Sequence, residues 1–416
     1  MKITLIAIGS RGDIQPMLAL ALALKESGHQ VEFCASPDFK DWIEASQLPF
    51  FPLGANMQEF TAQLLLKYQN NNRFDTKMLS AFMKEQTRSQ FETVPRVAAD
   101  SDLLIGGGTL FGMPSVAEYL GKPFIYTAFC PAYLPSSAYP PMHYMTNQYL
   151  PRFINALAWK MEAMINKRFM NPTINALRAT LGLAPVKDYV HYNLDIPFLV
   201  ATDPEISPVP PKVKQKYWQT GPFLLPPSNQ TLTPELEAFI NAGSPPVYAG
   251  FGSMAISDFQ HKTRLLLKAS ENLQFRVVLA KGWATLGDIK LPDTFHVIEG
   301  APHDLLFPRM AALIHHGGSG TLSVAARSGK PQIILPVIND QFYFGKRIHK
   351  SGIGPKALYG KKLTLRSLNR ALEEALFDPR MKERAALVAS GIKKNDGCGN
   401  ALAIIENLKF AQGRIL

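Results

Sequence analysis

The stretch LIHHGGSGTLSVAARSGKPQIILPVINDQ, residues 313–341, has the pattern of a strand, a glycine-rich turn and a helix. An apolar run ends at His315 and His316, and glycines and small hydroxyl side chains follow as far as Thr321. Proteins often build anion sites in this way, because the free N–H groups and the partial positive charge of a helix N-terminus face the ligand. The stretch therefore predicts an α/β domain with an anion site at this turn.

A second turn of this kind, residues 250–253, follows the strand that we expect over 246–251. The hydroxyls of Ser253, Ser319 and Thr321 could donate hydrogen bonds to a diphosphate, together with the ring of His316. Neither lysine nor metal would be needed. The alternative is that these are ordinary tight turns, in which Ser319 or Thr321 only caps a helix. Two such turns in one domain, with paired histidines, favour the anion site.

His315 stands one residue before His316 on the expected strand. Side chains alternate along a strand, so we expect His315 to face the other way and to be structural. The chain has no Asp-x-Asp pair and no His/Cys cluster at metal-ligand spacing, which predicts no catalytic metal.

Length and composition indicate a globular protein of two domains. A chain of 416 residues is too long for one core, and 46% apolar residues with only 19% charged ones exclude a disordered chain. Three scattered cysteines predict no disulfide framework.

The expected strand begins directly after Met1, which predicts that the protein has no signal peptide. The longest apolar runs, such as residues 17–24, are far shorter than the roughly 20 residues that a membrane span needs. We therefore expect a soluble, cytoplasmic protein. The net charge of +11 is spread without basic runs, so we expect no nucleic-acid partner.

Strands and helices alternate in both halves of the chain. The expected elements of the first half include a strand over 2–8, a helix entered through Pro16 and a strand over 30–35, and the alternation restarts at 246. Prolines crowd the segment between 207 and 245, which we expect to be the interdomain connection. The predicted fold is α/β, with two doubly wound, Rossmann-like domains and a cleft between them, at the carboxyl ends of the strands.

The segment 150–169 carries apolar residues at helical spacing, with basic residues on the opposite face. We expect a helix that packs its apolar stripe on the first domain, as surface helices of globular proteins do. The alternative is a basic amphipathic helix that rests on a membrane.

Two further strand ends carry side chains suited to chemistry. Asp13 lies in the turn that joins the first strand to the first helix, where a carboxylate is a natural helix cap. If the two domains face each other across the cleft, Asp13 also points at the ligand of the second domain and could act as a general base. Asp340 and Gln341 could grip vicinal sugar hydroxyls, although an ordinary polar loop would look the same.

The blocks GSRGDIQPMLALALALKESGH, FGSM, APHDLLFPRMAALIHHGGSGT and PVINDQFYFGKR occur in this order along nearly the whole chain. Together they resemble the nucleotide-sugar glycosyltransferases of the GT-B fold. Within this fold, they resemble most the bacterial and fungal sterol glucosyltransferases and the glucosyltransferases of glycopeptide antibiotics.

The resemblance implies an inverting transferase that moves a hexose, favouring glucose, from a UDP-sugar to a hydroxyl of an apolar acceptor. It implies Asp13 as the catalytic base, where many plant relatives have histidine. His316, Ser253 and 319–321 would bind the diphosphate, Asp340 and Gln341 the hexose, and 298–303 the base and ribose. The implied donor site comprises Ser10, Arg11, Gly12, Gly252, Ser253, Ile298, Pro302, His303, His316, Gly318, Ser319, Gly320, Thr321, Asp340 and Gln341.

The resemblance also implies an acceptor-binding domain over 1–206, a linker region over 207–245, a donor-binding domain over 246–394 and a segment over 395–416 that crosses back to the first domain. Besides the UDP-sugar co-substrate no prosthetic group is implied. We expect a monomer or weak dimer, with at most weak peripheral membrane contact.

Several alternatives stay open. The chain lacks the tryptophan near Gly300 that plant enzymes stack on uracil, so a dTDP-sugar transferred to an antibiotic aglycone is a second possibility. A lipid-linked-sugar transferase or an epimerase of the same fold is a third, and a nucleotide-sugar-binding protein without catalysis is a fourth. Segments 50–60, 78–91 and 129–149 are rich in Phe, Tyr, Met and Pro, which suits a sterol, polyphenol, macrolide or lipid acceptor but equally suits a core.

Overall fold

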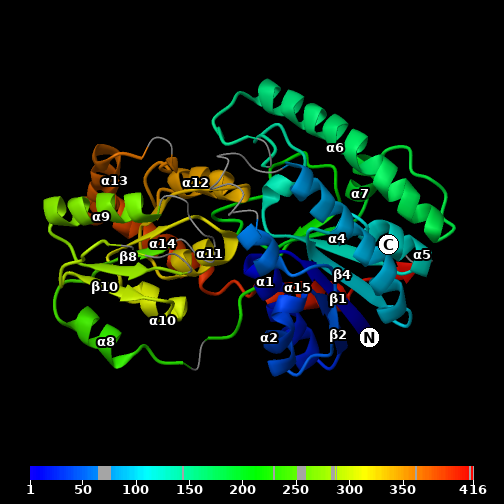
Figure 1. Ribbon diagram of the computed structural model, residues 1–416, viewed down its shortest axis with the longest axis horizontal. Coiled ribbons are helices and arrows are strands. Elements are labelled where there is room, and N and C mark those ends of the chain that lie inside the picture. Colours follow the sequence, from blue (N-terminus) through cyan, green and yellow to red (C-terminus); the bar gives the residue numbers. More distant parts are fainter. Residues whose placement is uncertain are drawn as a thin grey trace.

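The computed structural model describes residues 1–63, 76–142, 145–227, 230–250, 259–282, 286, 288–360, 363–411 and 414–415. Within these ranges the chain forms two parallel β-sheets with helices on both faces, and Figure 1 shows the two units side by side. The predicted α/β class with two doubly wound units is confirmed.

The first unit is built on a seven-stranded parallel sheet of order β3-β2-β1-β4-β5-β6-β7. Along β1, residues 3, 5 and 7 enter one apolar core and residues 6 and 8 enter the core on the other face, as strand alternation requires. The strand order reverses between β1 and β4. The strands are β1 Lys2–Ile8, β2 Gln30–Ala35, β3 Phe50–Pro52, β4 Leu103–Gly108, β5 Phe124–Ala128, β6 Phe198–Val200 and β7 Tyr217–Gln219.

Helices cover both faces of this sheet, and one of them comes from the far end of the chain. Cys398, Ala401 and Ile405 of α15 join the same apolar core as α1, so the last helix packs on the first unit (Figure 1). One face carries α1 Arg11–Glu26, α2 Lys40–Ala45 and α15 Gly397–Glu406; the other carries α4 Thr76–Val97, α5 Met113–Leu120, α6 Arg152–Thr180 and α7 Tyr189–Leu194.

The second unit has a five-stranded parallel sheet of order β10-β9-β8-β11-β12, and here the order reverses between β8 and β11. Its strands are β8 Val247–Gly250, β9 Val277–Ala280, β10 Phe295–Ile298, β11 Ala312–His315 and β12 Gln332–Ile334. Its helices are α8 Pro234–Asn241, α9 Phe259–Leu273, α10 His303–Leu306, α11 Ser319–Arg327, α12 Asp340–Lys350, α13 Leu365–Phe377 and α14 Pro379–Ile392. A short hairpin of β13 Phe410–Ala411 and β14 Arg414–Ile415 ends the chain.

The proline-rich segment 207–245 contains more regular structure than the sequence suggests. It holds β7, the edge strand of the first sheet, and α8, which joins a core of the second unit. The strand is only three residues long, and α8 begins directly after its Thr233 cap with a proline in the first turn. Both elements are therefore too short, and too close to prolines, to leave a periodic pattern in the sequence.

Over residues 153–165 the apolar stripe of the helix α6 points away from the protein, so the expectation that the stripe packs on the first unit is wrong for this part. Farther along the helix, Phe169 packs against an apolar core of the first unit, as expected. Five large apolar side chains of the outward part are between 45% and 73% exposed, whereas Asn155 and Glu162 are almost completely buried; the five are Phe153, Leu157, Met161, Met164 and Ile165. The inner face is held by specific hydrogen bonds: Asn155 Nδ2 donates to the carbonyl of Ser137 over 3.0 Å, and Trp159 Nε1 donates to that of Tyr139 over 3.0 Å. None of the helices in the described ranges is both long enough and apolar enough to cross a bilayer.

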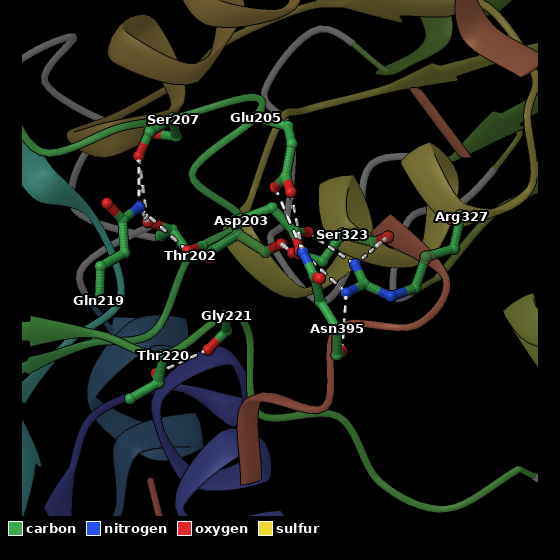
Figure 2. A network of polar contacts seen from close by, with 11 residues as sticks. Thr202, Asp203, Glu205, Ser207, Gln219, Thr220, Gly221, Ser323, Arg327 and Asn395 are labelled. Atoms are coloured by element: carbon green, nitrogen blue, oxygen red, sulfur yellow. Dashed lines mark hydrogen bonds and ion pairs between the residues drawn. The ribbon is translucent and has the colours of Figure 1, made fainter. Parts of the chain in front are cut away.

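A polar network joins the two units beside their sheets (Figure 2). Arg327 at the end of α11 makes a bidentate ion pair with the buried Asp203 of the first unit, over 2.7 and 2.9 Å. Asn395, where the chain returns to the first unit, donates to Asp203 and to Glu205. Arg347 of α12 donates to the carbonyl of Ile206 over 2.7 Å, so the loop after β6 binds both α11 and α12.

Candidate active site

The two turns singled out in the sequence lie at equivalent places in the two sheets. Asp13 follows β1 and His316 follows β11, and each of these strands flanks the point where the strand order of its sheet reverses. Ligands of doubly wound sheets bind at the carboxyl ends of the strands at this point. Residues of α1 lie close to residues of α11, so the helices that follow the two turns are neighbours where the units join.

The first helix begins earlier than expected, at Arg11 and not at Pro16. Ser10 is its N-cap and Asp13 occupies the third helical position, where the two side chains form a reciprocal capping box. This box starts the helix before the proline, which removes only the hydrogen bond to the carbonyl of Gly12. Asp13 therefore lies inside the first turn of α1.

Hydrogen bonds from Ser10 fix the Asp13 carboxylate. Its Oδ2 accepts from the backbone N–H of Ser10 over 2.8 Å and from the Ser10 hydroxyl over 3.2 Å. A Cβ atom at Gly9 would lie 2.2 Å from this oxygen, so only glycine leaves room for the carboxylate here. Both bonds end on Oδ2, and no hydrogen bond from the described residues reaches Oδ1.

Burial raises the pKa of Asp13 to about 6, although the two hydrogen bonds from Ser10 act in the opposite direction. A carboxylate with this pKa is mostly ionised at neutral pH and is still basic enough to take a proton from a hydroxyl as the hydroxyl reacts. The geometry and the pKa together fit a general base.

The two adjacent histidines have different surroundings. His315 is completely buried; its Nδ1 accepts from the N–H of Gly317 over 3.1 Å and its Nε2 lies 2.9 Å from Oε1 of Gln332. His315 thus holds the turn in place, as alternation along the strand predicts. His316 is half-buried, burial lowers its pKa to about 4, and its Nδ1 has no hydrogen-bond partner in the described part of the chain.

The N-terminus of α11 is formed by glycines and small residues. Gly317 has a φ of +90°, and a Cβ atom there would lie 2.7 Å from Ile334. Gly318 is the N-cap and makes no side-chain capping bond. Gly320 is exposed, and a Cβ atom there would meet nothing within 4 Å. The first N–H groups of α11 are therefore not capped by Gly318 and have open space beside Gly320, which suits an anion.

Charges of one unit act on side chains of the other. Burial lowers the pKa of His303 to about 4, and the positive charge of Arg11 contributes in the same direction. Burial raises the pKa of Tyr133 to about 12, and the carboxylates of both Asp13 and Asp340 add to it. The charges of Asp13 in the first unit and Asp340 in the second thus act on the same phenol, together with that of Glu162. Tyr133 belongs to the segment 129–149, which we named from the sequence as part of a possible acceptor pocket.

The loop before α12 has an unusual backbone. Asn339 has a φ of +47°, which is rare for a residue with a side chain and directs the chain sharply into Asp340. Gln341 is buried, and its Oε1 accepts from the N–H groups of Val337 and Ile338 over 2.8 and 3.1 Å. The oxygen of Gln341 is therefore engaged within its own loop and shapes it.

Three other predicted donor-site residues lie at the end of β10 and at the start of α10. Ile298 ends β10, Pro302 caps α10, and the ring of His303 stacks on Phe307 at 4.2 Å between centroids. Gly252 and Ser253 lie outside the described residues. In the described ranges no three His, Cys, Asp or Glu side chains are grouped so that they could hold a metal ion.

Comparisons with known proteins agree with this geometry. Residues 3–138 match the family "Glycosyltransferase family 28 N-terminal domain", and residues 264–396 match "Erythromycin biosynthesis protein CIII-like, C-terminal domain". Glycosyltransferase GtfE of Amycolatopsis orientalis is 36% identical, and vancomycin aglycone glucosyltransferase of the same organism is 34% identical; each alignment covers 97% of both chains. A sterol 3-beta-glucosyltransferase of Emericella nidulans is 32% identical over 99% of this chain, which spans 30% of that protein.

Solved structures share the fold at lower identity. Spinosyn forosaminyltransferase SpnP has a TM-score of 0.71 at 18% identity, and each chain is covered to 98%. Glycosyltransferase VinC in complex with dTDP has a TM-score of 0.65 at 21% identity, with 98% of this chain and 99% of that chain covered. The chain therefore belongs to the GT-B glycosyltransferases, in the group of the glycopeptide and sterol glucosyltransferases.

Proposed function

We propose that this protein transfers a hexose, with glucose as the expected sugar, from a UDP-sugar to a hydroxyl of an apolar small molecule, with inversion at the anomeric carbon. The observation that carries the proposal is the position of Asp13: a carboxylate with its pKa raised to about 6, fixed through one oxygen, where α1 meets α11. A protein that only binds a nucleotide sugar has no need of a base at this place.

The turn after β11 would hold the leaving group. Negative charge grows on the diphosphate as the bond to the sugar breaks, and N–H groups fixed in advance stabilise this charge best. Gly318, Ser319, Gly320 and Thr321 supply the first N–H groups and two hydroxyls of α11. Burial lowers the pKa of His316 to about 4, so the ring is neutral at pH 7 and carries one N–H. Since its buried Nδ1 has no acceptor among the described residues, the tautomer with the proton on Nε2 leaves fewer buried donors unsatisfied.

The acceptor hydroxyl would lie between Oδ1 of Asp13 and the anomeric carbon. As the hydroxyl oxygen bonds to that carbon, its proton moves to Asp13 and the electron pair of the old glycosidic bond leaves with the diphosphate. Attack from the face opposite the diphosphate converts an α-linked donor sugar into a β-linked product. Asp340 and Gln341 would hold sugar hydroxyls on the side of the second unit; the Gln341 oxygen already accepts from its own loop, so its amide N–H₂ group would be the part that binds.

Asp13→Asn tests the base. We expect the Kd for UDP to be unchanged and kcat to fall by a factor of about 10² or more, because an amide cannot accept the proton. Asp41→Asn, which removes an exposed carboxylate of the neighbouring helix α2, is the matched control and should behave as wild type. Wild-type turnover in Asp13→Asn would contradict the assignment, and so would an equal loss in the control.

The donor and the acceptor are tested by a product screen. UDP-glucose and dTDP-glucose are each offered with sterols, flavonoids, macrolides and lipids, and products are read by mass spectrometry. We expect products with UDP-glucose and competition by UDP. The neighbour VinC binds dTDP, so a preference for dTDP-glucose would replace UDP in the proposal. If neither donor gives product or is hydrolysed while UDP still binds, the protein is a nucleotide-sugar-binding protein.

A further inference from the structure

The outward face of α6 is an apolar surface without cover from the described residues. Figure 1 shows α6 as a long helix along the outer edge of the first unit. We call this surface the α6 face; its large apolar side chains are those of Phe153, Leu157, Met161, Met164 and Ile165, each at least 45% exposed. Their spacing of three, four and seven residues places them on one side of a helix.

The N-terminal half of α6 is inverted compared with an ordinary surface helix, whereas its C-terminal half buries Met170 and Ile174 in the core of the first unit. Asn155 and Glu162 are 1% and 5% exposed on the inner side, whereas Phe153 is 73% exposed on the outer side. Leaving several large apolar side chains in water on one helix costs free energy, and monomeric proteins rarely present such contiguous patches without a use for them. The arrangement indicates a surface that is covered when the protein works.

The charges of the α6 face are of one sign. Arg152, Lys160, Lys167 and Arg168 are exposed on α6, and the only acidic residue in this part of the helix, Glu162, is buried. Lys167 lies 3.1 Å from Asp188 and is partly neutralised. Helical spacing places Lys160 and Arg168 beside the apolar side chains and not on the opposite face, where we expected the basic residues from the sequence. Apolar side chains that insert between basic ones are typical of helices that lie on anionic membranes.

We propose that the α6 face docks this protein on an anionic lipid bilayer. A second copy of the chain fits less well, because a twofold dimer through this face would bring the same basic side chains together. A single straight helix that stands out from the protein can lie flat on a lipid surface, with the apolar side chains among the acyl chains and the basic groups among the phosphates.

Docking would also place the reaction near the bilayer; this part rests on the proposed function. Asn155 and Trp159 of α6 donate to the carbonyls of Ser137 and Tyr139. These two residues follow Tyr133 closely along the chain, and the charge of the Asp13 carboxylate helps to raise the pKa of Tyr133. An apolar acceptor that partitions into the membrane would then reach the base from the side on which α6 lies.

The full chain is tested by cosedimentation with vesicles of phosphatidylcholine alone and of phosphatidylcholine mixed with phosphatidylglycerol, a measurement that needs no activity. We expect binding to the mixed vesicles that weakens with salt. The variant Phe153→Ser/Leu157→Ser should bind at least about tenfold more weakly. Its matched control is Phe377→Ser/Leu387→Ser, which removes two side chains of similar exposure, 62% and 61%, from the second unit.

The charge is tested separately with Lys160→Glu/Arg168→Glu, which should also lose about tenfold or more, against Arg264→Glu/Lys268→Glu on α9. The proposal is overturned if the wild-type protein binds neither kind of vesicle at low salt, or if the α6 variants bind as well as their controls. It is also overturned if analytical ultracentrifugation finds a dimer or a bound acidic protein that the α6 substitutions release, without any vesicle binding.

Discussion

The turns after β1 and after β11 start from the same plan and finish with different chemistry. Each is a buried parallel strand that passes through glycine into a helix at a point of strand reversal, and the two helices meet. In the first turn, Ser10 and Asp13 cap α1 with their own side chains. In the second turn, Gly318 caps α11 without any side-chain hydrogen bond.

This difference decides what each helix end can do. The N-terminus of α1 already has a carboxylate, so it has little need of an anion from outside, and that carboxylate is held ready for proton transfer. The N-terminus of α11 leaves N–H groups for a ligand that brings its own negative charge. One turn thus supplies a base, and the other a place for a leaving group.

The largest effect expected within the second turn comes from the two histidines. His316→Ala should weaken UDP binding by about 10 to 100-fold, because it removes a donor to the diphosphate, and should leave the free energy of unfolding almost unchanged. His315→Ala should cost about 2–3 kcal/mol of unfolding free energy, because Gly317 and Gln332 lose a buried partner. Calorimetric titration with UDP and urea unfolding separate the two; a strongly destabilised His316→Ala would show that both histidines are scaffold.

A smaller effect compares the two helix ends at matched positions. Gly12 and Gly320 are both exposed and both occupy the second helical position, of α1 and of α11. Alanine at either should favour the helix by up to about 1 kcal/mol. We expect Gly320→Ala to weaken UDP binding by about tenfold, because the methyl group enters the open space beside the N–H groups. An equal loss in Gly12→Ala would show that both helix ends hold the anion and would end the distinction drawn above.

Much of the fold could be predicted from short patterns. The strand β1, the helix α5 and the alternation that defines two parallel sheets follow from buried apolar runs bounded by glycine, since these patterns are local. Which side of α6 is buried could not be predicted from the sequence. Periodicity shows which residues share a face of a helix, but it does not show which face packs on the protein. Hydrogen bonds from Asn155 and Trp159 to the segment that precedes the helix decide which side faces the protein.

The candidate site divides in the same way. Asp13 and His316 stand at strand ends and could be found from the sequence, whereas Tyr133 and Asn339 could not, since their importance depends on which residues lie near them. The pairing of Asp203 with Arg327 joins residues 124 apart and left no pattern (Figure 2). Gly9 could have been recognised, since the turn that begins there needs space for the Asp13 carboxylate.

The first turn should also show a cost for its function. The pKa of Asp13 is raised from 3.8 to about 6, so the ionised carboxylate destabilises the folded state above pH 6 and has no such effect below about pH 4. Asp13→Asn should therefore raise the free energy of unfolding by up to about 3 kcal/mol at pH 8, with most of the gain lost as the pH falls to 4. Urea unfolding at the two pH values measures this, and an equal stability at pH 8 would show that the carboxylate is well solvated.

The smallest effect separates the cap from the base within the first turn. Ser10→Ala removes the hydroxyl that donates to Oδ2 of Asp13 but keeps the backbone N–H, so the ionised form loses one of its two hydrogen bonds. The pKa of Asp13 should rise further, and the acidic limb of the pH dependence of kcat/KM, expected near pH 6, should move to higher pH. Thr233→Ala removes the cap of α8 in the second unit and should leave that limb in place. If the acidic limb of the kcat/KM profile stays near pH 6 in Ser10→Ala, another group titrates there. That group, and not Asp13, would then be the base that distinguishes the first turn from the second.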